Sequence, residues 1–328
     1  MKTVRWGMIG CGDVAEVKSG PGFYKASHSS LVAVMRRNGV RAADFARRHG
    51  VARWSDDAQA IINAPDIDVV YISTLTDSHR EYTLRCAQAG KPVYVEKPMA
   101  MNYTEALEMV EACRSAGVLL WVGYYRRALP RFLKVKQLVE AGAVGQVRVV
   151  ISRQTATLPA LRAVAELPWR VDAKLSGGGF FFEAACHTFD FLDFLFGPIV
   201  KVEAIAANQA NAYQPEDVVV AAYQFKSGVY GSGTWCYTAD EDYEMNEIIG
   251  STGRIQFSTS KPVPVRLQRG GSVEEFPVAD PPHVHQPMIQ SIVDELNGVG
   301  HCHSTGVTAA RTAWVMDEIL KELRGTDD

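Results

Sequence analysis

A glycine pattern close to the N-terminus constrains the fold of this chain more than any other feature. The residues Gly10-Cys11-Gly12-Asp13-Val14-Ala15 fit G-x-G-x-x-A and directly follow an apolar segment at residues 4–9. Glycines at this spacing allow a tight strand-to-helix turn and let a pyrophosphate approach the backbone at the positive end of the helix. Because glycine is common, a plain turn is the alternative, but the place of the pattern after a first strand favours a nucleotide site.

Short apolar segments and helical patterns alternate through the first 120 residues. We expect strands at residues 4–9, 31–35, 69–73, 92–95 and 118–122, and helices at residues 41–49, 79–89 and 103–116. Gly50, Gly90 and Gly117 follow these helices, as is common at helix C-termini. Buried strands that alternate with helices are typical of βαβ units in a parallel sheet. The pattern therefore predicts an α/β protein with a Rossmann NAD(P)-binding domain over residues 1–123.

The pattern changes after Tyr124. We expect helices at residues 130–141, 180–196 and 307–323, and strands at residues 146–154, 200–208, 217–225, 229–237, 246–250 and 254–257. The dipeptides Ser227-Gly228 and Thr252-Gly253 suit the turns of hairpins. Residues 124–328 are therefore predicted to form an α+β domain built on an open, mostly antiparallel sheet with helices on one face.

Composition narrows the class of protein. The chain has 328 residues, enough for two domains, and a net charge of -3 without a long basic run, so we expect no nucleic-acid partner. The six cysteines are scattered without a C-x-x-C pair, which indicates free thiols in a reducing compartment. No signal peptide and no apolar run of membrane-spanning length are present, so we expect a cytoplasmic protein with no membrane partner.

The end of the second expected strand bears on the choice of cofactor. In dinucleotide-binding domains, an acidic residue roughly 20 positions beyond the glycines binds the ribose 2′-hydroxyl. This chain has Arg36 there, with Arg37 beside it. A guanidinium pairs with the 2′-phosphate that an aspartate would repel, so the sequence favours NADP, with NAD as the alternative. Two solvated surface arginines are the competing interpretation.

Two further motifs make the prediction specific. Glu96-Lys97-Pro98 ends an expected parallel strand, where ligands of such sheets bind. The other motif begins with three glycines and reads Gly177-Gly178-Gly179-Phe180-Phe181-Phe182-Glu183-Ala184-Ala185-Cys186-His187-Thr188-Phe189-Asp190. Together with the N-terminal glycines, these motifs make the chain resemble, over essentially its whole length, the glucose-fructose oxidoreductase, inositol dehydrogenase and rhizopine-catabolism (Gfo/Idh/MocA) family of dehydrogenases.

The resemblance implies an activity and its residues. Members of the family mostly oxidise or reduce a carbon that bears a hydroxyl or carbonyl group on sugars, cyclitols and related small molecules. The catalytic lysine of the family falls on Lys97, its catalytic histidine on His187, and the acidic residue four positions earlier on Glu183. The family usually has Asp there, so Glu183 is a departure that lengthens the side chain. The open sheet often serves as an oligomer interface, which implies a homo-oligomer, a dimer or a tetramer.

The chemistry of these side chains agrees with that assignment. Glu183 and His187 are four residues apart and therefore share one face of the expected helix. A carboxylate can orient an imidazole and stabilise its cation, so His187 could exchange a proton with a carbinol while hydride moves to or from a nicotinamide. Lys97 could stabilise charge on the same oxygen. Taken singly, a core histidine and a lysine that ends a strand are the ordinary interpretations.

Further positions are expected to contact the cofactor. The complete set is Gly10, Cys11, Gly12, Asp13, Val14, Arg36, Arg37, Ser73, Thr74, Leu75, His79, Glu96, Lys97, Arg126, Trp169 and Arg170. Structural roles are open for several of them: Asp77 or Ser78 as a helix N-cap in the loop before His79, an ion pair for Arg126, and simple burial for Trp169. The residue before Arg126 is Tyr125, where the family often has Asn.

Two other groups of residues are set aside. Cys186 is next to His187, but neighbours in sequence point about 100 degrees apart on a helix, so a reactive pair is not expected. The histidines at 283, 285, 301 and 303 lack zinc-ligand spacing, and we expect no metal.

Two rival functions remain open. One is an activity like that of dihydrodiol dehydrogenases on a non-sugar diol, with which the aromatic residues Trp169 and Phe180 to Phe182 are compatible. The other is a non-catalytic cofactor-binding sensor or co-repressor. Such a protein would be expected to lack the lysine or the histidine, and this chain has both Lys97 and His187, which favours an enzyme.

Overall fold

The chain forms two compact units in the computed structural model, which describes residues 1–158 and 168–325. The first unit comprises Met1–Leu129 and Pro281–Ala310, and the second comprises Pro130–Asp280 and Arg311–Asp328. The sequence-based domains at 1–123 and 124–328 assume two continuous segments, whereas the chain returns to the first unit at Pro281. The reason is packing: helix α9 (Gln286–Leu296) contacts α1 (Gly20–Lys25) and buries Met288, Ile289, Ile292 and Val293.

A parallel sheet forms the centre of the first unit. Its strands, in spatial order, are β3 (Arg53–Ser55), β2 (Ser29–Met35), β1 (Val4–Ile9), β4 (Val69–Ile72), β5 (Val93–Val95) and β6 (Leu120–Val122), and every pair is parallel. The order runs outward in both directions from β1 and β4. Ligands of such sheets bind at the carboxyl ends of the strands where the order reverses, which here is the β1–β4 edge.

Helices surround these strands. Besides α1 and α9 they are α2 (Gly39–His49), α3 (Ala58–Ile62), α4 (His79–Gln88) and α5 (Tyr103–Ser115), with short 3-10 turns η2 (Thr76–Ser78) and η3 (Tyr125–Ala128). Every residue of β4 and β5 is buried, as expected for a parallel sheet covered on both faces. The Rossmann-type fold predicted from the sequence is confirmed.

A wide helical turn follows the glycine pattern. The π-helical segment η1 (Ala15–Ser19) precedes α1, and the N–H of Gly20 donates to the carbonyl oxygen of Ala15, five residues back. Pro21 cannot donate a backbone hydrogen bond, and a Cβ at Gly20 would lie 2.2 Å from that carbonyl oxygen. Local sequence therefore produces the widened turn, a feature often found near functional sites.

An eight-stranded sheet forms the second unit. Its strands, in spatial order, are β14 (Ser272–Phe276), β13 (Val265–Arg269), β12 (Gly253–Phe257), β11 (Tyr243–Gly250), β7 (Val147–Thr157), β10 (Tyr230–Ala239), β9 (Val218–Phe225) and β8 (Ile199–Ala207). All pairs are antiparallel except β7 with β10. The helical elements are α6 (Pro130–Glu140), η5 (Trp169–Val171), α7 (Ala173–Ser176) and α8 (Phe180–Phe196), while α10 (Gly306–Arg324) begins in the first unit and continues in the second from Arg311.

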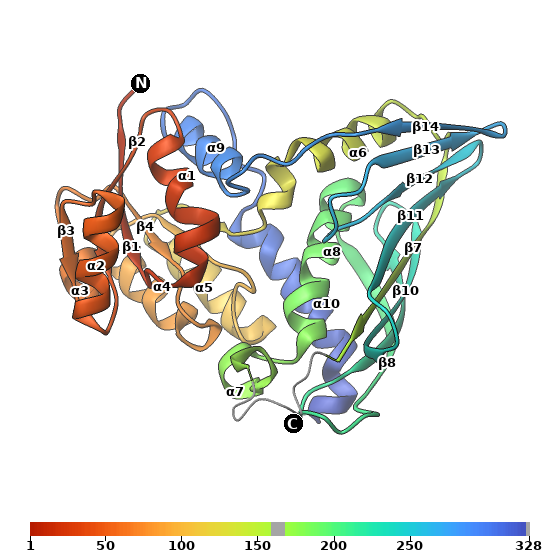
Figure 1. The fold of residues 1–328 in the computed structure, drawn as a ribbon, viewed down its shortest axis with the longest axis horizontal. Coiled ribbons are helices and arrows are strands. Elements are labelled where there is room, and N and C mark those ends of the chain that lie inside the picture. The colour runs from red at the N-terminus through yellow and green to blue at the C-terminus, as the bar shows by residue number, and fades with distance from the viewer. Residues whose placement is uncertain (159–167, 326–328) are drawn as a thin grey trace. The chain divides into compact units, whose positions relative to one another are not determined.

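The two faces of this sheet differ. Helix α8 packs on β9 and β10, and side chains such as Val219 and Trp235 are buried on that face. Figure 1 shows α6 and α8 on the same side of the strands, and none of the described helices of this unit covers the other side. The alternate residues of the strands are exposed there, among them the apolar Ile205 and Val220. The predicted open, mostly antiparallel sheet with helices on one face is confirmed.

No helix among the described residues is both long and apolar enough to span a lipid bilayer.

Candidate functional site

The glycine loop is held against the loop that follows β4. Gly10 has a φ of 97°, and a Cβ at this position would lie 2.7 Å from the carbonyl carbon of Ser73. The hydroxyl of Ser73 donates to the carbonyl oxygen of Gly10 at 2.7 Å. Only glycine combines this backbone conformation with this close approach. The structure thus brings together two predicted cofactor segments at the edge where the strand order reverses.

The rest of the glycine loop leaves open space above the helix start. A Cβ at Gly12 would meet nothing closer than the Gly10 carbonyl oxygen at 3.9 Å, and Asp13 is exposed. The first N–H groups of a helix have no partner within the helix, so the backbone at Asp13 and Val14 is of the kind that can bind an anion. Cys11 is buried, and burial raises the pKa of its thiol to about 11, so its side chain is unreactive.

Arg36 lies beside this loop. Its backbone N–H donates to Ser55 of β3, and its Nη1 donates to the carbonyl oxygen of Cys11 at 3.3 Å. The side chain is half-buried, whereas Arg37 is exposed. The structure therefore brings Arg36 to the glycine loop, while Arg37 faces solvent at the start of the connection to α2.

The loop after β4 is tied to the Glu96-Lys97-Pro98 segment by His79. Its Nδ1 lies 3.0 Å from the carbonyl oxygen of Pro98, and its Nε2 lies 3.2 Å from that of Thr74. Burial lowers the pKa of His79, so the ring is neutral and donates to one carbonyl at a time. The Ser78 hydroxyl donates back to Thr74 and to the carbonyl of Leu75, so it does not cap α4 as the structural alternative proposed.

Glu96 lies beneath Lys97 at the carboxyl end of β5. Its Oε1 accepts a hydrogen bond of 2.5 Å from the Tyr71 hydroxyl, and its Oε2 accepts the backbone N–H of Lys97 at 3.2 Å. Glu96 is buried, whereas Lys97 is half-buried. The carboxylate therefore holds the peptide that carries Lys97.

Arg126 follows β6 in the 3-10 turn η3. Its guanidinium stacks on the ring of Tyr125 at 5.1 Å from the ring centroid, and the side chain is buried. The neighbouring Arg127 donates to the carbonyl oxygen of His303 within the same unit. In this turn, Arg127 therefore stabilises the fold, and Arg126 provides a buried positive charge.

The second unit carries the other predicted catalytic side chains on α8. Glu183 and His187 are one helical turn apart, and both are buried. The Nε of Arg170 lies 3.7 Å from Oε2 of Glu183, and its guanidinium stacks 4.6 Å from the centroid of the Trp169 ring. Four predicted residues of this unit therefore lie together near the start of α8. Lys97 belongs to the first unit, so each half of the expected catalytic set is built within its own unit.

A residue that sequence reasoning missed holds the start of α8. Oε1 of Glu216 accepts the N–H of Gly179 at 2.9 Å and lies 3.3 Å from the N–H of Phe182. A Cβ at Gly178 would lie 2.5 Å from Cβ of Phe182, and one at Gly179 would lie 2.9 Å from the Glu216 carbonyl oxygen. The glycines of the second motif thus allow the helix to begin against Glu216. No local signal identifies Glu216, because it caps a helix 37 residues away.

The cysteine and the histidines from which we expect no chemistry make contacts that are common in folded proteins. Cys186 is buried, and its thiol lies 3.4 Å from the Glu183 carbonyl oxygen. His285 is also buried and contacts Tyr94, and His301 lies 2.8 Å from Glu295. Within residues 1–158 and 168–325, no group of three or more His, Cys, Asp or Glu residues could hold a metal ion. That no metal is needed stays a prediction.

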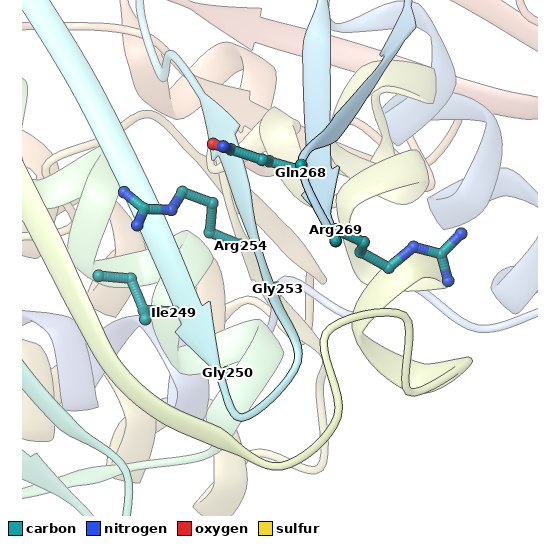
Figure 2. A pocket seen from close by; sticks show the side chains of 8 residues that line it. Ile249, Gly250, Gly253, Arg254, Gln268 and Arg269 are labelled. Atoms are coloured by element: carbon teal, nitrogen blue, oxygen red, sulfur yellow. The ribbon is translucent and has the colours of Figure 1, made fainter.

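A hollow of about 230 Å³ lies at the hairpin ends of the second sheet, away from every predicted site residue. Figure 2 shows Arg254 and Gln268, which are register partners on β12 and β13, with the side chain of Arg269 extending in another direction. The lining residues are Ile249, Gly250, Gly253, Arg254, Gln268, Arg269, Gly270 and Gly271. The hollow has no connection with the predicted chemistry.

Comparison with known proteins agrees with the resemblance. A family model described as "Oxidoreductase family, NAD-binding Rossmann fold" matches residues 4–124, and one described as "GFO/IDH/MocA C-terminal domain" matches residues 132–256.

Three curated relatives match most of the chain. Oxidoreductase P35 of Formosa agariphila is 39% identical, over 98% of this chain and 99% of its own length. A 1,5-anhydro-D-fructose reductase of Ensifer adhaerens is 28% identical, over 92% of this chain and 91% of its own. A trans-1,2-dihydrobenzene-1,2-diol dehydrogenase of Sus scrofa is 26% identical, over 92% and 85%.

Proposed function

Since the chain belongs to the Gfo/Idh/MocA family of oxidoreductases, we propose that it transfers hydride between a nicotinamide and a hydroxyl- or carbonyl-bearing carbon of a sugar, cyclitol or related small molecule. The observation that carries the proposal is the position of Lys97 at the carboxyl end of β5, in a sheet whose glycine loop has room for a pyrophosphate. The similarity to a 1,5-anhydro-D-fructose reductase supports a sugar-like substrate.

The residues of the first unit fit a dinucleotide. The open space at Gly12 and the helix start at Asp13 would accept the pyrophosphate. Ser73 and Thr74 border the same loop, and Leu75, next in the chain, is proposed as a further contact. When bound, the nicotinamide supplies the site that accepts or gives hydride. Arg126 is a buried cation in the turn η3, which follows β6, and we propose that it also contacts the dinucleotide.

Arg36 supports NADP as the preferred cofactor, with NAD as the alternative. Its guanidinium lies against the glycine loop, where an acidic residue would bind a ribose hydroxyl in an NAD-specific domain. A guanidinium can form a bidentate, charge-assisted pair with a 2′-phosphate. Arg37 is exposed beside it and is proposed to add a weaker, solvent-screened attraction.

The acid–base chemistry is assigned to α8 and Lys97. His187 is proposed to take the proton from the substrate hydroxyl during oxidation and to return it during reduction. Glu183 orients the imidazole and stabilises its cation, and Arg170 limits the positions that the carboxylate can adopt. Lys97 donates a hydrogen bond to the same substrate oxygen and stabilises the negative charge that develops there. Trp169, stacked with Arg170, is proposed to border the nicotinamide.

A non-sugar diol is the second candidate substrate. The observation in its favour is the similarity to a trans-1,2-dihydrobenzene-1,2-diol dehydrogenase. Phe180, which is half-buried near the start of α8 and packs on the buried Tyr213 and Tyr237, offers aromatic surface that such a ring would contact. A non-catalytic sensor is disfavoured because Lys97, Glu183 and His187 are all present.

The open face of the second sheet is proposed to join subunits into a dimer or a tetramer. Ile205 and Val220 are register partners on β8 and β9 and are 73% and 47% exposed. Contiguous exposed apolar side chains of this kind commonly mark protein interfaces. Free cysteines and the composition support a cytoplasmic location.

The experiment that tests the function is a turnover screen. The purified protein is incubated with NADP or NAD and a panel of aldoses, anhydrosugars, cyclitols and cyclic diols, and reduction of the nicotinamide is followed by absorbance. The reverse reaction is run with the reduced cofactors and the corresponding ketones. Turnover of a sugar or cyclitol that Lys97→Ala reduces by about 100-fold or more supports the proposal. Full turnover by Lys97→Ala, or preference for the aromatic diol alone, contradicts it.

A further inference from the structure

Four buried side chains are linked beneath Lys97 in the first unit. The Tyr94 hydroxyl lies 2.7 Å from Nδ1 of His285, and Nε2 of His285 lies 3.6 Å from Oε1 of Glu96. The same Oε1 accepts the hydroxyl hydrogen of Tyr71. The side chains come from β4, from β5 and its end, and from the segment that returns from the second unit. His285 has 1% of its surface exposed, so the contact is fully within the protein.

The chemistry of these groups sets the direction of the hydrogen bonds. A carboxylate only accepts, so the hydrogen on a neutral His285 ring is best placed on Nε2, facing Glu96. Nδ1 then accepts from the Tyr94 hydroxyl, which also lies 3.6 Å from the weaker acceptor Sδ of Met288. The hydrogen-bonded pair of Tyr94 and His285 therefore lies against Glu96, with Nε2 of His285 at 3.6 Å from Oε1, and Tyr71 donates to the same oxygen from the other side. The polar groups of His285 and Tyr71 thus lie against the same oxygen of the Glu96 carboxylate.

Glu96 also contacts the backbone of Lys97 directly. Its second oxygen, Oε2, accepts the backbone N–H of Lys97. A Cβ at Gly123 would lie only 3.0 Å from Oε2, so the neighbouring strand end closes around the carboxylate. The orientation of the Lys97 peptide therefore depends on where the carboxylate is held.

Burial keeps the His285 ring neutral. Burial is the main reason that its pKa is lowered; Glu96 opposes this effect, while Lys18, Arg126 and Lys97 add to it. Tyr125 packs on the ring at 4.5 Å between centroids, and Tyr94 contacts it from β5. A neutral His285 leaves the negative charge of Glu96 beside Lys97 instead of cancelling it.

We propose that His285 is a positioning residue for Lys97, which acts through Glu96 by holding that carboxylate in its orientation under the lysine peptide. The proposal rests on the function assigned to Lys97. An apolar side chain would fill the same core position without the desolvation cost of a polar chain, which argues for a role beyond packing. It also gives a reason for the return of Pro281–Ala310 to the first unit, because that segment brings His285 to the end of β5.

The test compares two substitutions with a matched control. His285→Gln keeps an acceptor for Tyr94 and a donor for Glu96, whereas His285→Leu has neither. His301→Leu makes the same change at an exposed histidine of the same unit. Each variant is assayed with the substrate from the turnover screen for kcat, KM and cofactor affinity across pH, after circular dichroism confirms folding.

We expect His285→Leu to lower kcat by about tenfold or more with little change in KM or cofactor affinity. His285→Gln should restore most of kcat, and His301→Leu should match wild type. A folded His285→Leu variant with the wild-type kcat would overturn the proposal, as would an equal loss in both His285 variants.

A measurement without substrate separates this proposal from the proposed function. The lysines are dimethylated with carbon-13, and the pKa of Lys97, assigned with Lys97→Arg, is followed by NMR in the cofactor-saturated protein. A lower pKa of Lys97 in His285→Leu than in wild type supports the positioning role even if no substrate is found. An unchanged pKa contradicts it. Full turnover by Lys97→Ala would instead reject the catalytic assignment of Lys97.

Discussion

The guanidinium of Arg36 lies against the glycine loop, where Nη1 donates to the carbonyl oxygen of Cys11 at 3.3 Å. The side chain is thus held where the adenosine ribose of a bound dinucleotide is expected. Arg36→Asp should weaken NADP binding by about tenfold to 100-fold, because it exchanges a charge-assisted pair for repulsion, and should affect NAD far less. Titration calorimetry with both cofactors measures the change.

Arg47→Asp provides the control for that experiment, because it makes the same charge change on the exposed side of α2. It should leave both affinities near wild type. Wild-type preference for NAD would reject the argument about the arginine while leaving the hydride-transfer proposal intact. Binding of neither cofactor would contradict the assignment of the site.

A methyl group at Gly10 is expected to disrupt the cofactor site. The φ of 97° is unfavourable for alanine, and the added Cβ would lie 2.7 Å from the backbone of Ser73. Gly10→Ala should therefore cost about 1–3 kcal/mol of unfolding free energy and weaken cofactor binding together with it. Gly50→Ala also places alanine at positive φ but meets no atom within 4 Å, so it isolates the backbone strain. Equal losses in the two variants would show that the contact with Ser73 contributes nothing.

Long, strongly patterned elements were predictable from the sequence, and short or long-range ones were not. The bounds of β1 and α8 are those predicted, because both have continuous apolar faces and glycines beside them. Strand β3 and helix α3 were missed, since three and five residues give no readable period. Helix α9 was also missed, although its apolar residues recur at helical spacing, because Pro281, Pro282 and Pro287 lie before it and in its first turn and obscure its start.

The candidate site also contains residues that local motifs indicate and residues that only long-range contacts place there. Motifs located Lys97, Glu183 and His187, because each lies in a local pattern of glycines or next to a strand end. His285 and Glu216 had no such pattern: their roles depend on Glu96, 189 positions earlier, and on Gly179, 37 positions earlier. Contacts between such distant positions are set by the topology of the two units and cannot be inferred from neighbouring residues in one sequence.

Glu216 is predicted to affect stability in a pH-dependent way. Burial is the main reason that its pKa is raised above the usual value. The folded protein therefore binds the proton more tightly than the unfolded chain, and stability falls as the pH rises between the two pKa values. Glu216→Gln keeps an acceptor for the N–H of Gly179 without the charge, so it should be more stable than wild type at pH 8 and similar at pH 4.

Glu216→Ala tests the capping contact itself. It removes the acceptor at the start of α8 and should cost about 1 kcal/mol or more at both pH values. Urea denaturation at pH 4 and pH 8 measures the free energy of unfolding of the wild type, Glu216→Gln and Glu216→Ala. A Gln variant less stable than wild type at pH 8 would contradict the assigned direction of the pKa.

Substitutions of Glu183 test whether this residue, which replaces the usual aspartate of the family, takes part in catalysis. Its carboxylate lies 3.7 Å from Arg170 and one helical turn from His187. Glu183→Gln removes the charge that stabilises a protonated imidazole and should lower kcat by about tenfold or more. Glu183→Asp keeps the charge but retracts it by one methylene, so we expect a smaller loss. A Gln variant with the wild-type kcat would remove Glu183 from the mechanism, whichever rate the Asp variant shows.

The open sheet face yields a prediction about assembly. Ile205 and Val220 face each other across β8 and β9 and are largely exposed, as are Tyr230 and Ile151 on the same sheet. A charge at either position would be buried unpaired in an interface, at a cost of several kcal/mol. Val220→Asp should therefore shift the protein to a smaller species in sedimentation velocity, whereas Val299→Asp, an exposed change in the first unit, should not. A monomeric wild type, or a Val220→Asp protein of unchanged size, would contradict assembly through this face, because a sheet that buries these side chains against a second copy cannot accept the charge without separating.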